Sequence, residues 1–563
     1  MPSLSLKRKA ACDDGPPKKQ QLLTPTFSGV SASQSTVNKL VTNFVVGDMQ
    51  ALSVVESPDF IKLVTSGFPG KKVMTRKTLV GEIETMAQSM KQHLTCHLSS
   101  ATAVCTTADI WTAHNRSYFG CTVHWIDETS LKRKSAALAC KRLYGRHTFD
   151  LIASTLEEIH AKYGISDKVV CTVTDNGSNF VKAFNEFAEE PQSTRSTPEN
   201  SVNEFTFSNV DEILTADDNR DNASYSLPPH HRCGAHTMNL VAVADAEAAN
   251  ADAHYKSLSR STMAKCAGLW NKSSRSPLAA EAVMSATQKT LIVPNSTRWN
   301  SFYMAVAKIH SIIEIQTESV LNSLCEKLGL PVFRPNEVNF VSEYVKVMQP
   351  VAKSLDTLQA EMQCFMGILL PTVASLRTRL DQLKVTLRYA GPLADALLEG
   401  LQQRFGHLEQ RQDLLQASVS HPQFKLRWLN TEAAKMTGKA ALLEAMQSVS
   451  ASGGATGAAD TNHANEADDF FCFYDTNVAS NSVSAELDMY INDTSHDIDS
   501  LHRFPLVKKV FIAKNTALPS SAPVERLFSI GGQILTPRRN GLSDEHFEEL
   551  LMLRANKHLQ ENC

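Results

Sequence analysis

Two aspartates that follow strand-like segments are the first residues in this chain that could do chemistry together. The β-branched run at 169–174 indicates a buried strand, and it stops at the turn formed by Asp175, Asn176 and Gly177. Asp109 lies at the end of an earlier strand-like run, ATAVCTTADIWTA. Open α/β sheets bind ligands at the carboxyl ends of their strands, so paired carboxylates there suggest a cation site. Taken alone, Asp175 could simply start the turn and cap the next helix.

A third acid, Glu525, lies in the motif SAPVERLFSIGG near the end of the chain. The motif predicts a short helix capped by Ser521, with Pro523 in its first turn and Gly531-Gly532 at its end. A glutamate in a first helical turn is also favoured by the helix dipole alone. Its residue type and position therefore leave both a structural and a functional role open.

Other polar residues have roles that the sequence leaves open. Cys233 and His236 form a C-x-x-H pair, but a structural zinc site takes four ligands. A buried cysteine beside a strand-end histidine is the alternative. Arg538 and Arg539 lie between two predicted helices, where they could bind phosphate or form a solvated charge pair.

The elements that must position these residues alternate in a recognisable order. Three strand-like runs fill 101–145, a helix with one apolar face follows, and a strand then leads to Asp175 and another helix. Strand, strand, strand, helix, strand, helix is the order of an RNase H-like core. In that fold the first and fourth strands are neighbours, so Asp109 and Asp175 should lie close together.

The predicted fold class is α/β, with an RNase H-like core interrupted by a large all-α insertion domain and preceded by an N-terminal helical segment. Within 1–35, Lys7-Arg8-Lys9 and Lys18-Lys19 resemble a bipartite nuclear import signal, although a solvated basic tail is the alternative. The expected segments are a disordered basic tail at 1–35, a helical segment at 36–100, the first part of the core at 101–236, the insertion at 237–450, a flexible linker at 451–482, and a C-terminal region completing the core at 483–563.

Composition bounds the class of protein. The chain has 563 residues, is 42% hydrophobic and 20% charged, and carries a net charge of -3, so any nucleic-acid surface must be a local patch. Its twelve cysteines contain no C-x-x-C pair, which favours a reducing compartment. No apolar run approaches the roughly 20 residues that a membrane span needs, so we expect no membrane partner.

Five motifs in order resemble the hAT superfamily of DNA transposases and their domesticated relatives, among them the vertebrate zinc-finger BED-type proteins. The motifs are TADIWTAHNRSYFGCTVHWID, VTDNGSNFVKAF, HHRCGAHTMNLV, NSTRWNS and SAPVERLFSIGGQILTPRRNGLSDEHFEELLMLRAN. The resemblance implies a catalytic and metal-binding triad of Asp109, Asp175 and Glu525 that uses Mg²⁺ or Mn²⁺ for DNA strand cleavage and transfer.

The same resemblance implies DNA and a second copy of the chain as partners. It places Cys233 and His236 beside the active site and implies that Trp299, next to Arg298, stacks on an extruded base, although Trp299 could also pack in a core. The residues expected to bind DNA are Cys233, His236, Arg298, Trp299, Arg538 and Arg539. The C-terminal region is implied to dimerise, with help from 36–100, through Leu527, Phe528, Phe547, Leu550, Leu551 and Leu553.

Two departures from the family keep a second function open. The Cys/Cys/His/His spacing of a BED finger is absent, so we predict no structural zinc, and the Trp-rich segment before the last helices is shortened to DSLHRFP. The first hypothesis is a nuclear, dimeric DNA strand-transfer enzyme. The alternatives are a non-catalytic transcription or chromatin regulator on the same scaffold, or a purely structural dimeric interaction protein.

Overall fold

The computed structural model describes most of the chain, in seven segments. They are residues 32–175, 177–187, 225–294, 299–360, 363–452, 478–536 and 541–560. The predicted import signal and most of the predicted linker lie outside these segments. The chain divides into two compact units, Met1–Glu82 and Ile83–Cys563, which are described separately.

The first unit is helical in its described part. Its helices bury one apolar face each, as the three- and four-residue spacing of Val37, Val41 and Val45 requires. Ser33 caps the first of them by accepting a hydrogen bond from the Thr36 N–H. The elements are α1 (Gln34–Gly47), η1 (Leu52–Glu56), α2 (Pro58–Gly67) and the start of α3 (Arg76–Ser99), which runs on into the second unit.

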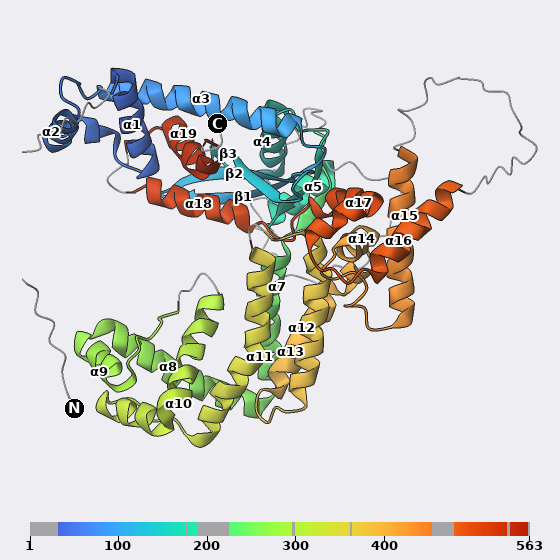
Figure 1. Cartoon of the computed structure of the whole chain (residues 1–563). Helices are drawn as coiled ribbons and strands as arrows, with labels where there is room; N and C mark the ends of the chain where they lie inside the picture. Colours follow the sequence, from blue (N-terminus) through green and yellow to red (C-terminus); the bar gives the residue numbers. More distant parts are fainter. Residues whose placement is uncertain are drawn as a thin grey trace, which may run out of the picture. The chain divides into compact units, whose positions relative to one another are not determined.

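A five-stranded mixed sheet organises the second unit (Figure 1). The strand order is β3-β2-β1-β4-β5, with β1, β2 and β3 antiparallel to one another and β4 parallel to both β1 and β5. The prediction of an α/β fold whose first and fourth strands are neighbours is therefore confirmed. The strands are β1 (Val104–Ala113), β2 (Arg116–Ile126), β3 (Arg133–Leu143), β4 (Val169–Thr174) and β5 (His230–Arg232).

The two faces of the sheet carry different helices, because side chains alternate along each strand. On β2, Phe119 joins an apolar cluster with residues of α4 and α5, whereas Tyr118 contacts Phe547 of α19 and Gly120 adjoins Phe528 of α18. These four helices are α4 (Phe149–Lys162), α5 (Ser178–Phe187), α18 (Ala522–Ile534) and α19 (Asp544–Ala555).

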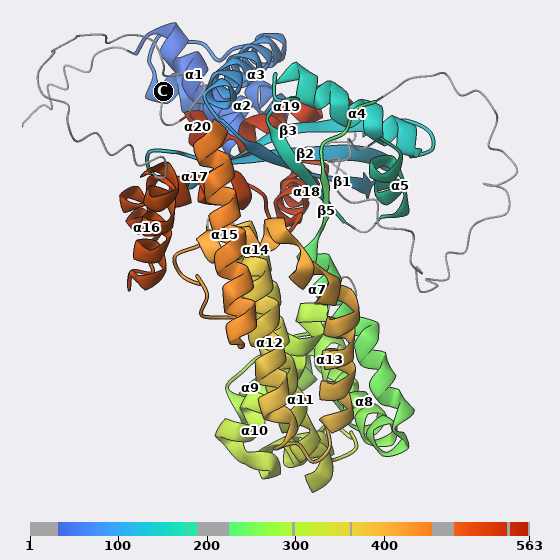
Figure 2. The same ribbon diagram turned by 90° about the vertical axis from the view of Figure 1, so that its right-hand side faces the viewer.

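A long run of helices separates β5 from α18, and in its described residues it contains no strand. Helices α11, α12 and α13 of this run lie side by side (Figure 2). The run comprises α7 (Gly234–Val243), η2 (Asp245–Ala251), α8 (Ala253–Arg275), α9 (Pro277–Thr287), α10 (Trp299–Lys327), α11 (Pro335–Gln359), η3 (Met366–Ile368), α12 (Leu369–Lys384), α13 (Gly391–Phe405), η4 (Gly406–Gln410), α14 (Gln412–Ser420), α15 (Glu432–Ser452), α16 (Val478–Asn492), η6 (Ile498–Arg503) and α17 (Pro505–Asn515).

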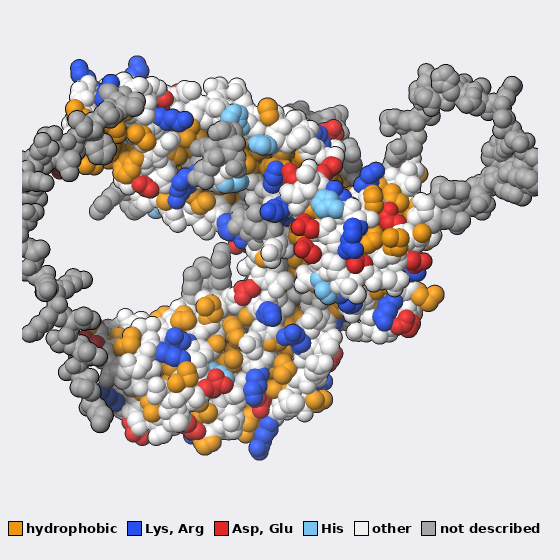
Figure 3. All heavy atoms as spheres, viewed as in Figure 1, with side chains coloured by type: hydrophobic (Ala, Val, Ile, Leu, Met, Phe, Trp, Pro, Cys, Tyr) orange, Lys and Arg blue, Asp and Glu red, His pale blue; other side chains and the backbone are white. Residues whose placement is uncertain are grey.

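The chain ends in short helices that return to the sheet. The last of them is α20 (Lys557–Gln560), and the preceding Asn556 bonds both backbone groups of Ala137 on β3. In the described part of the chain, no helix combines the length and apolar character needed to cross a bilayer. On the face shown in Figure 3, basic and acidic side chains are interspersed.

Candidate active site

Asp109 lies inside β1 rather than at its end, which corrects the prediction from sequence. The parallel ladder between β1 and β4 stops at the pair Ala108 and Thr174, one residue before Asp109. β1 then continues to Ala113 as one arm of a hairpin with β2. Asp109 thus occupies the point where β1 parts from β4, and its carboxyl group remains beside the end of β4.

Asp175 follows β4 directly, as the sequence predicts. Its Oδ1 accepts a hydrogen bond of 3.0 Å from the Gly177 N–H, so it also makes the turn that precedes α5. Asp109 is held in a similar way, because its Oδ1 accepts a 2.7 Å bond from the Ile110 N–H. Each aspartate therefore has one oxygen engaged by its own local backbone.

Glu525 comes to the same side of the sheet as Asp109 because its helix, α18, packs closely on β2. Gly120 is the direct partner of Asp109 across the β1–β2 ladder. A Cβ atom at Gly120 would lie 2.4 Å from the Phe528 ring and 2.8 Å from Val524, so any larger residue would push the helix away. Sequence reasoning missed this residue, although a glycine inside a strand is a known sign of close approach.

A second glycine contact fixes the same helix against β1. Trp111 stacks on Phe528 with ring centroids 5.6 Å apart, and a Cβ atom at Gly531 would lie 3.1 Å from the Trp111 ring. The prediction that Gly531-Gly532 ends the helix is wrong, since α18 continues to Ile534. These glycines make room for the tryptophan instead of terminating the helix.

Cys233 joins three segments around the site. Its N–H donates to the carbonyl of Thr174 at the end of β4, and its sulfur accepts bonds of 3.3 Å from the N–H groups of His236 and Ser521. Its exposed fraction is 1%, so the structure does not offer this side chain to DNA, contrary to our assignment from sequence. The cysteine instead caps α7 and holds the segment that leads into α18.

Ser521 is the N-cap residue of α18, as the sequence predicts, but a neighbouring side chain makes the hydrogen bond. The Ser521 side chain makes no capping bond, and the neighbouring Ser520 Oγ accepts from the Ala522 N–H at 3.1 Å. Pro523 lies in the first turn as predicted. Ser521 is therefore the N-cap by position, while the hydroxyl of Ser520 accepts the Ala522 N–H and the Ser521 N–H bonds the Cys233 sulfur.

The three acids act on one another electrostatically. Burial raises the pKa of Asp109 to about 7, and the negative charges of Asp175 and Glu525 add to this rise, against the Ile110 N–H bond that lowers it. Among the residues that the structure describes, no three His, Cys, Asp or Glu side chains are grouped closely enough to hold a metal ion. The acids therefore repel one another without forming a ready-made ligand cluster.

The remaining DNA-binding assignments stay predictions. His236 is partly buried in the first turn of α7. Arg298, Arg538 and Arg539 lie outside the described residues, and of Trp299 only its place at the start of α10 is described.

The six residues predicted to dimerise are buried inside a single chain. None of them has an exposed fraction above 6%, and Phe547 packs on Tyr118 of β2 with ring centroids 4.8 Å apart. They form no exposed apolar patch, so the prediction that these side chains provide a dimer surface is wrong. The set is Leu527, Phe528, Phe547, Leu550, Leu551 and Leu553.

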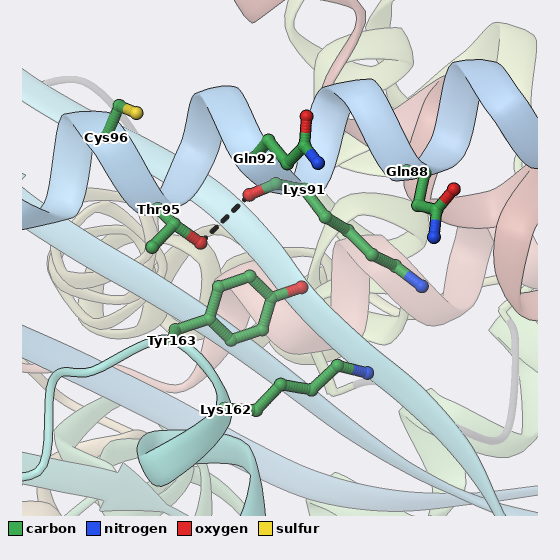
Figure 4. Close-up of a pocket in the computed structure, with 7 residues that line it drawn as sticks. All are labelled: Gln88, Lys91, Gln92, Thr95, Cys96, Lys162 and Tyr163. Carbon is green, nitrogen blue, oxygen red and sulfur yellow. Dashed lines mark hydrogen bonds between the residues drawn. The ribbon is translucent and has the colours of Figure 1, made fainter.

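A pocket of about 370 Å³ lies elsewhere, between α3 and the end of α4 (Figure 4). Its wall includes Tyr163, whose hydroxyl donates to the carbonyl of Leu138. None of the three acids lines it. The lining residues are Gln88, Lys91, Gln92, Thr95, Cys96, Lys162 and Tyr163.

Comparison with known proteins agrees with this arrangement. Residues 107–201 match the family model of the ZBED1 RNase-like domain. The Zea mays protein named "Putative AC9 transposase" is 26% identical over 314 residues, which cover 54% of this chain and 33% of that protein. The Zea mays "Putative AC transposase" is 28% identical over 261 residues, covering 45% of this chain and 28% of that protein. The chain thus spans about a third of the length of these curated relatives. Taken with the sheet order, these matches support a transposase-derived protein that is similar to members of the hAT family.

Proposed function

We propose that this protein is a nuclear, DNA-binding hAT transposase-like enzyme that cleaves and transfers DNA strands with Mg²⁺ or Mn²⁺. One observation carries the proposal. Asp109, Asp175 and Glu525 come from distant parts of the chain, yet the charges of Asp175 and Glu525 add to the rise in the pKa of Asp109 that burial causes. An acid with a perturbed pKa beside the carboxyl end of a central strand is typical of functional sites.

The donor set fits a divalent cation. Carboxylate oxygens are the ligands that hard cations prefer, and a cation would relieve the repulsion that raises the Asp109 pKa. Bound metal would activate the attacking water or 3′-hydroxyl and stabilise the leaving oxygen. Asp109 and Asp175 would each turn one oxygen toward the cation while the other keeps its backbone bond.

Protons take part in this binding because Asp109 is partly protonated near neutral pH. A carboxyl group must lose its proton before it can ligate a metal, so cation binding should release one proton from Asp109 below pH 7. Gly120 and Cys233 contribute by position, since one admits α18 to the sheet and the other holds the segment before it.

One observation favours the alternative of a non-catalytic DNA- or chromatin-binding regulator. The described residues contain no group of three potential ligands at metal-binding distance, and both aspartates use an oxygen in hydrogen bonds with their local backbone. A chain that binds DNA without cleaving it would use the same scaffold, and its three acids would have no catalytic role.

A cleavage assay separates the two functions. The purified chain is incubated with end-labelled nicked or hairpin DNA and with Mg²⁺, Mn²⁺ or a chelator. We expect metal-dependent strand cleavage that is lost in Asp109→Asn, Asp175→Asn and Glu525→Gln. Glu281→Gln, an exposed acid on α9, is the matched control and should cleave like the parent. DNA binding without cleavage under all metal conditions would reject the enzyme and leave the regulator.

Self-association and nuclear import belong to the same proposal and rest on the family relationship. Sedimentation of the full chain at micromolar concentration should show a dimer or a larger oligomer, and a monomer would contradict self-association.

Replacing Lys7-Arg8-Lys9 by alanine should move a fluorescent fusion of the chain out of the nucleus. Unchanged nuclear accumulation would exclude this import signal.

A further inference from the structure

Two cysteines face each other in the sheet, on the two strands that lead to the aspartates. Cys105 on β1 and Cys171 on β4 are direct partners in the parallel ladder, and their sulfur atoms lie 3.6 Å apart. Both are buried, with exposed fractions of 0% and 1%. In the described structure both are free thiols.

The spacing of the pair matches the spacing of the acids. Cys105 precedes Asp109 by four residues on β1, and Cys171 precedes Asp175 by four residues along the other strand. Since side chains alternate along a strand, Cys105 lies on the same face of the sheet as Asp109, and Asp175 directly follows the strand that carries Cys171. A bond between the sulfurs would therefore join the two strands that present the acids.

The usual spacing of neighbouring strands suits a disulfide between paired residues. Adjacent strands lie about 4.8 Å apart, and disulfides join Cα atoms separated by about 4.4–6.8 Å. The sulfurs must approach from 3.6 Å to about 2.05 Å, which rotation about the side-chain torsions can supply without moving either strand far.

The surroundings make the two thiols unequal. Burial opposes ionisation of Cys105, but the bond with Cys171, the Leu518 N–H and the charge of Arg133 together lower the pKa of this thiol. The bond with Cys105 and burial raise the pKa of Cys171 well above its usual range. Arg133 is itself buried and donates to the carbonyls of Asn515, Thr516 and Ala517. We assign the role of nucleophile to Cys105 because the Leu518 N–H and the Arg133 charge act on its sulfur and favour its thiolate.

We propose that Cys105 and Cys171 form a reversible disulfide on exposure to hydrogen peroxide and so cross-link β1 to β4, the two strands that lead to the aspartates. The Cys105 thiolate attacks one peroxide oxygen, the O–O bond breaks, and the leaving hydroxide takes a proton to become water. The Cys171 sulfur then attacks the resulting sulfenic acid, the S–S bond forms and the S–O bond breaks. The Cys171 proton leaves with that oxygen as a second water, so two thiols are oxidised and one peroxide is reduced.

Oxidation would also affect the segment that leads into α18, the helix that carries Glu525. Leu518, whose N–H bonds the Cys105 sulfur, lies in the segment between α17 and α18. A disulfide sulfur is a weaker acceptor than a thiolate, so oxidation should loosen the hold of Cys105 on this segment. The proposal itself requires no cleavage activity and stands independently of the proposed enzyme.

Peptide mapping tests the cross-link directly. The full chain is treated with hydrogen peroxide, alkylated, digested without reductant and analysed by mass spectrometry, with oxidation of the exposed Cys96 as the internal check that oxidant was sufficient. We expect a linked pair of peptides containing Cys105 and Cys171, lighter by two hydrogens and separated by reductant. The linked pair should be absent from Cys171→Ala and present in Cys140→Ala, a buried cysteine on β3.

The parent chain alone can overturn the proposal, so the result does not depend on whether a variant folds. If Cys96 is fully oxidised while Cys105 and Cys171 remain alkylatable as thiols after denaturation, the proposal is wrong. Linkage of Cys105 to any other cysteine would contradict it equally.

Discussion

Replacing Asp109 by asparagine should stabilise the folded protein at neutral pH in the absence of metal. The structure raises the pKa of this carboxyl from 3.8 to about 7 through burial and the charges of Asp175 and Glu525. A shift of about three units corresponds to roughly 4 kcal/mol of preference for the protonated form, at about 1.36 kcal/mol per unit. Asparagine keeps an oxygen that can accept the Ile110 N–H bond, so the change removes mainly the charge.

The sign of the pH dependence follows from the direction of the shift. The folded protein holds its Asp109 proton more tightly than the unfolded chain does, so ionisation favours unfolding. The destabilisation is absent below pH 3.8, grows as pH rises toward about 7, and is constant above that value. Asp109→Asn should therefore match the parent near pH 4 and exceed its free energy of unfolding by up to about 4 kcal/mol at pH 8.

Denaturant unfolding at several pH values between 4.5 and 8, with chelator present, measures this difference. Glu281→Gln, which removes an exposed carboxylate, should follow the parent curve at every pH. Adding Mg²⁺ should narrow the gap, since only the parent retains the full acidic set. An Asp109→Asn chain that is no more stable than the parent at pH 8, or whose advantage does not change with pH, would refute the electrostatic account of this site.

Two further predictions test the packing and the proton linkage of the same site. Gly120→Ala places a Cβ against Phe528 and should destabilise the chain by about 1–3 kcal/mol in denaturant unfolding, whereas Gly391→Ala, with open space around it, should change little. Equal effects of the two substitutions would contradict the close contact of α18 with β2. Calorimetric titration with Mg²⁺ in buffers of different ionisation enthalpy should show about one proton released per chain at pH 6 and far less at pH 8, a difference that Asp109→Asn should abolish. Proton release that is the same at both pH values would point away from Asp109.

The strand order and the pairing of the two aspartates could be predicted from local patterns. Alternating and β-branched runs identify the strands, and a turn or helix separates each from the next. That order alone predicts that Asp109 and Asp175 lie close together, because it makes their strands neighbours. The exact position of Asp109 within β1 did not follow, because the hairpin to β2 continues the same apolar pattern past the acid.

The buried C-terminal residues show where sequence reasoning fails. Leucines and phenylalanines on a helix can cover their own core or a second chain, and their spacing is the same in both cases. Phe547 lies against Tyr118 and Leu551 is fully buried, but those contacts join residues more than 400 positions apart. Cys233 was misassigned for a related reason, since nothing local reveals that its sulfur bonds the Ser521 N–H.

Small residues that carry no charge help to position the third acid, Glu525. Gly120 on β2 and Gly531 on α18 each leave a space that a larger residue would fill, and Phe528 and Trp111 occupy those spaces. Shape complementarity of this kind fixes the distance and rotation of a helix more tightly than a charge pair can, because packed interiors do not deform continuously. Glu525 is one turn from Phe528 on the same helix. Its place relative to Asp109 therefore depends on two glycines that carry no chemistry, and their replacement should disturb the site before any acid is changed.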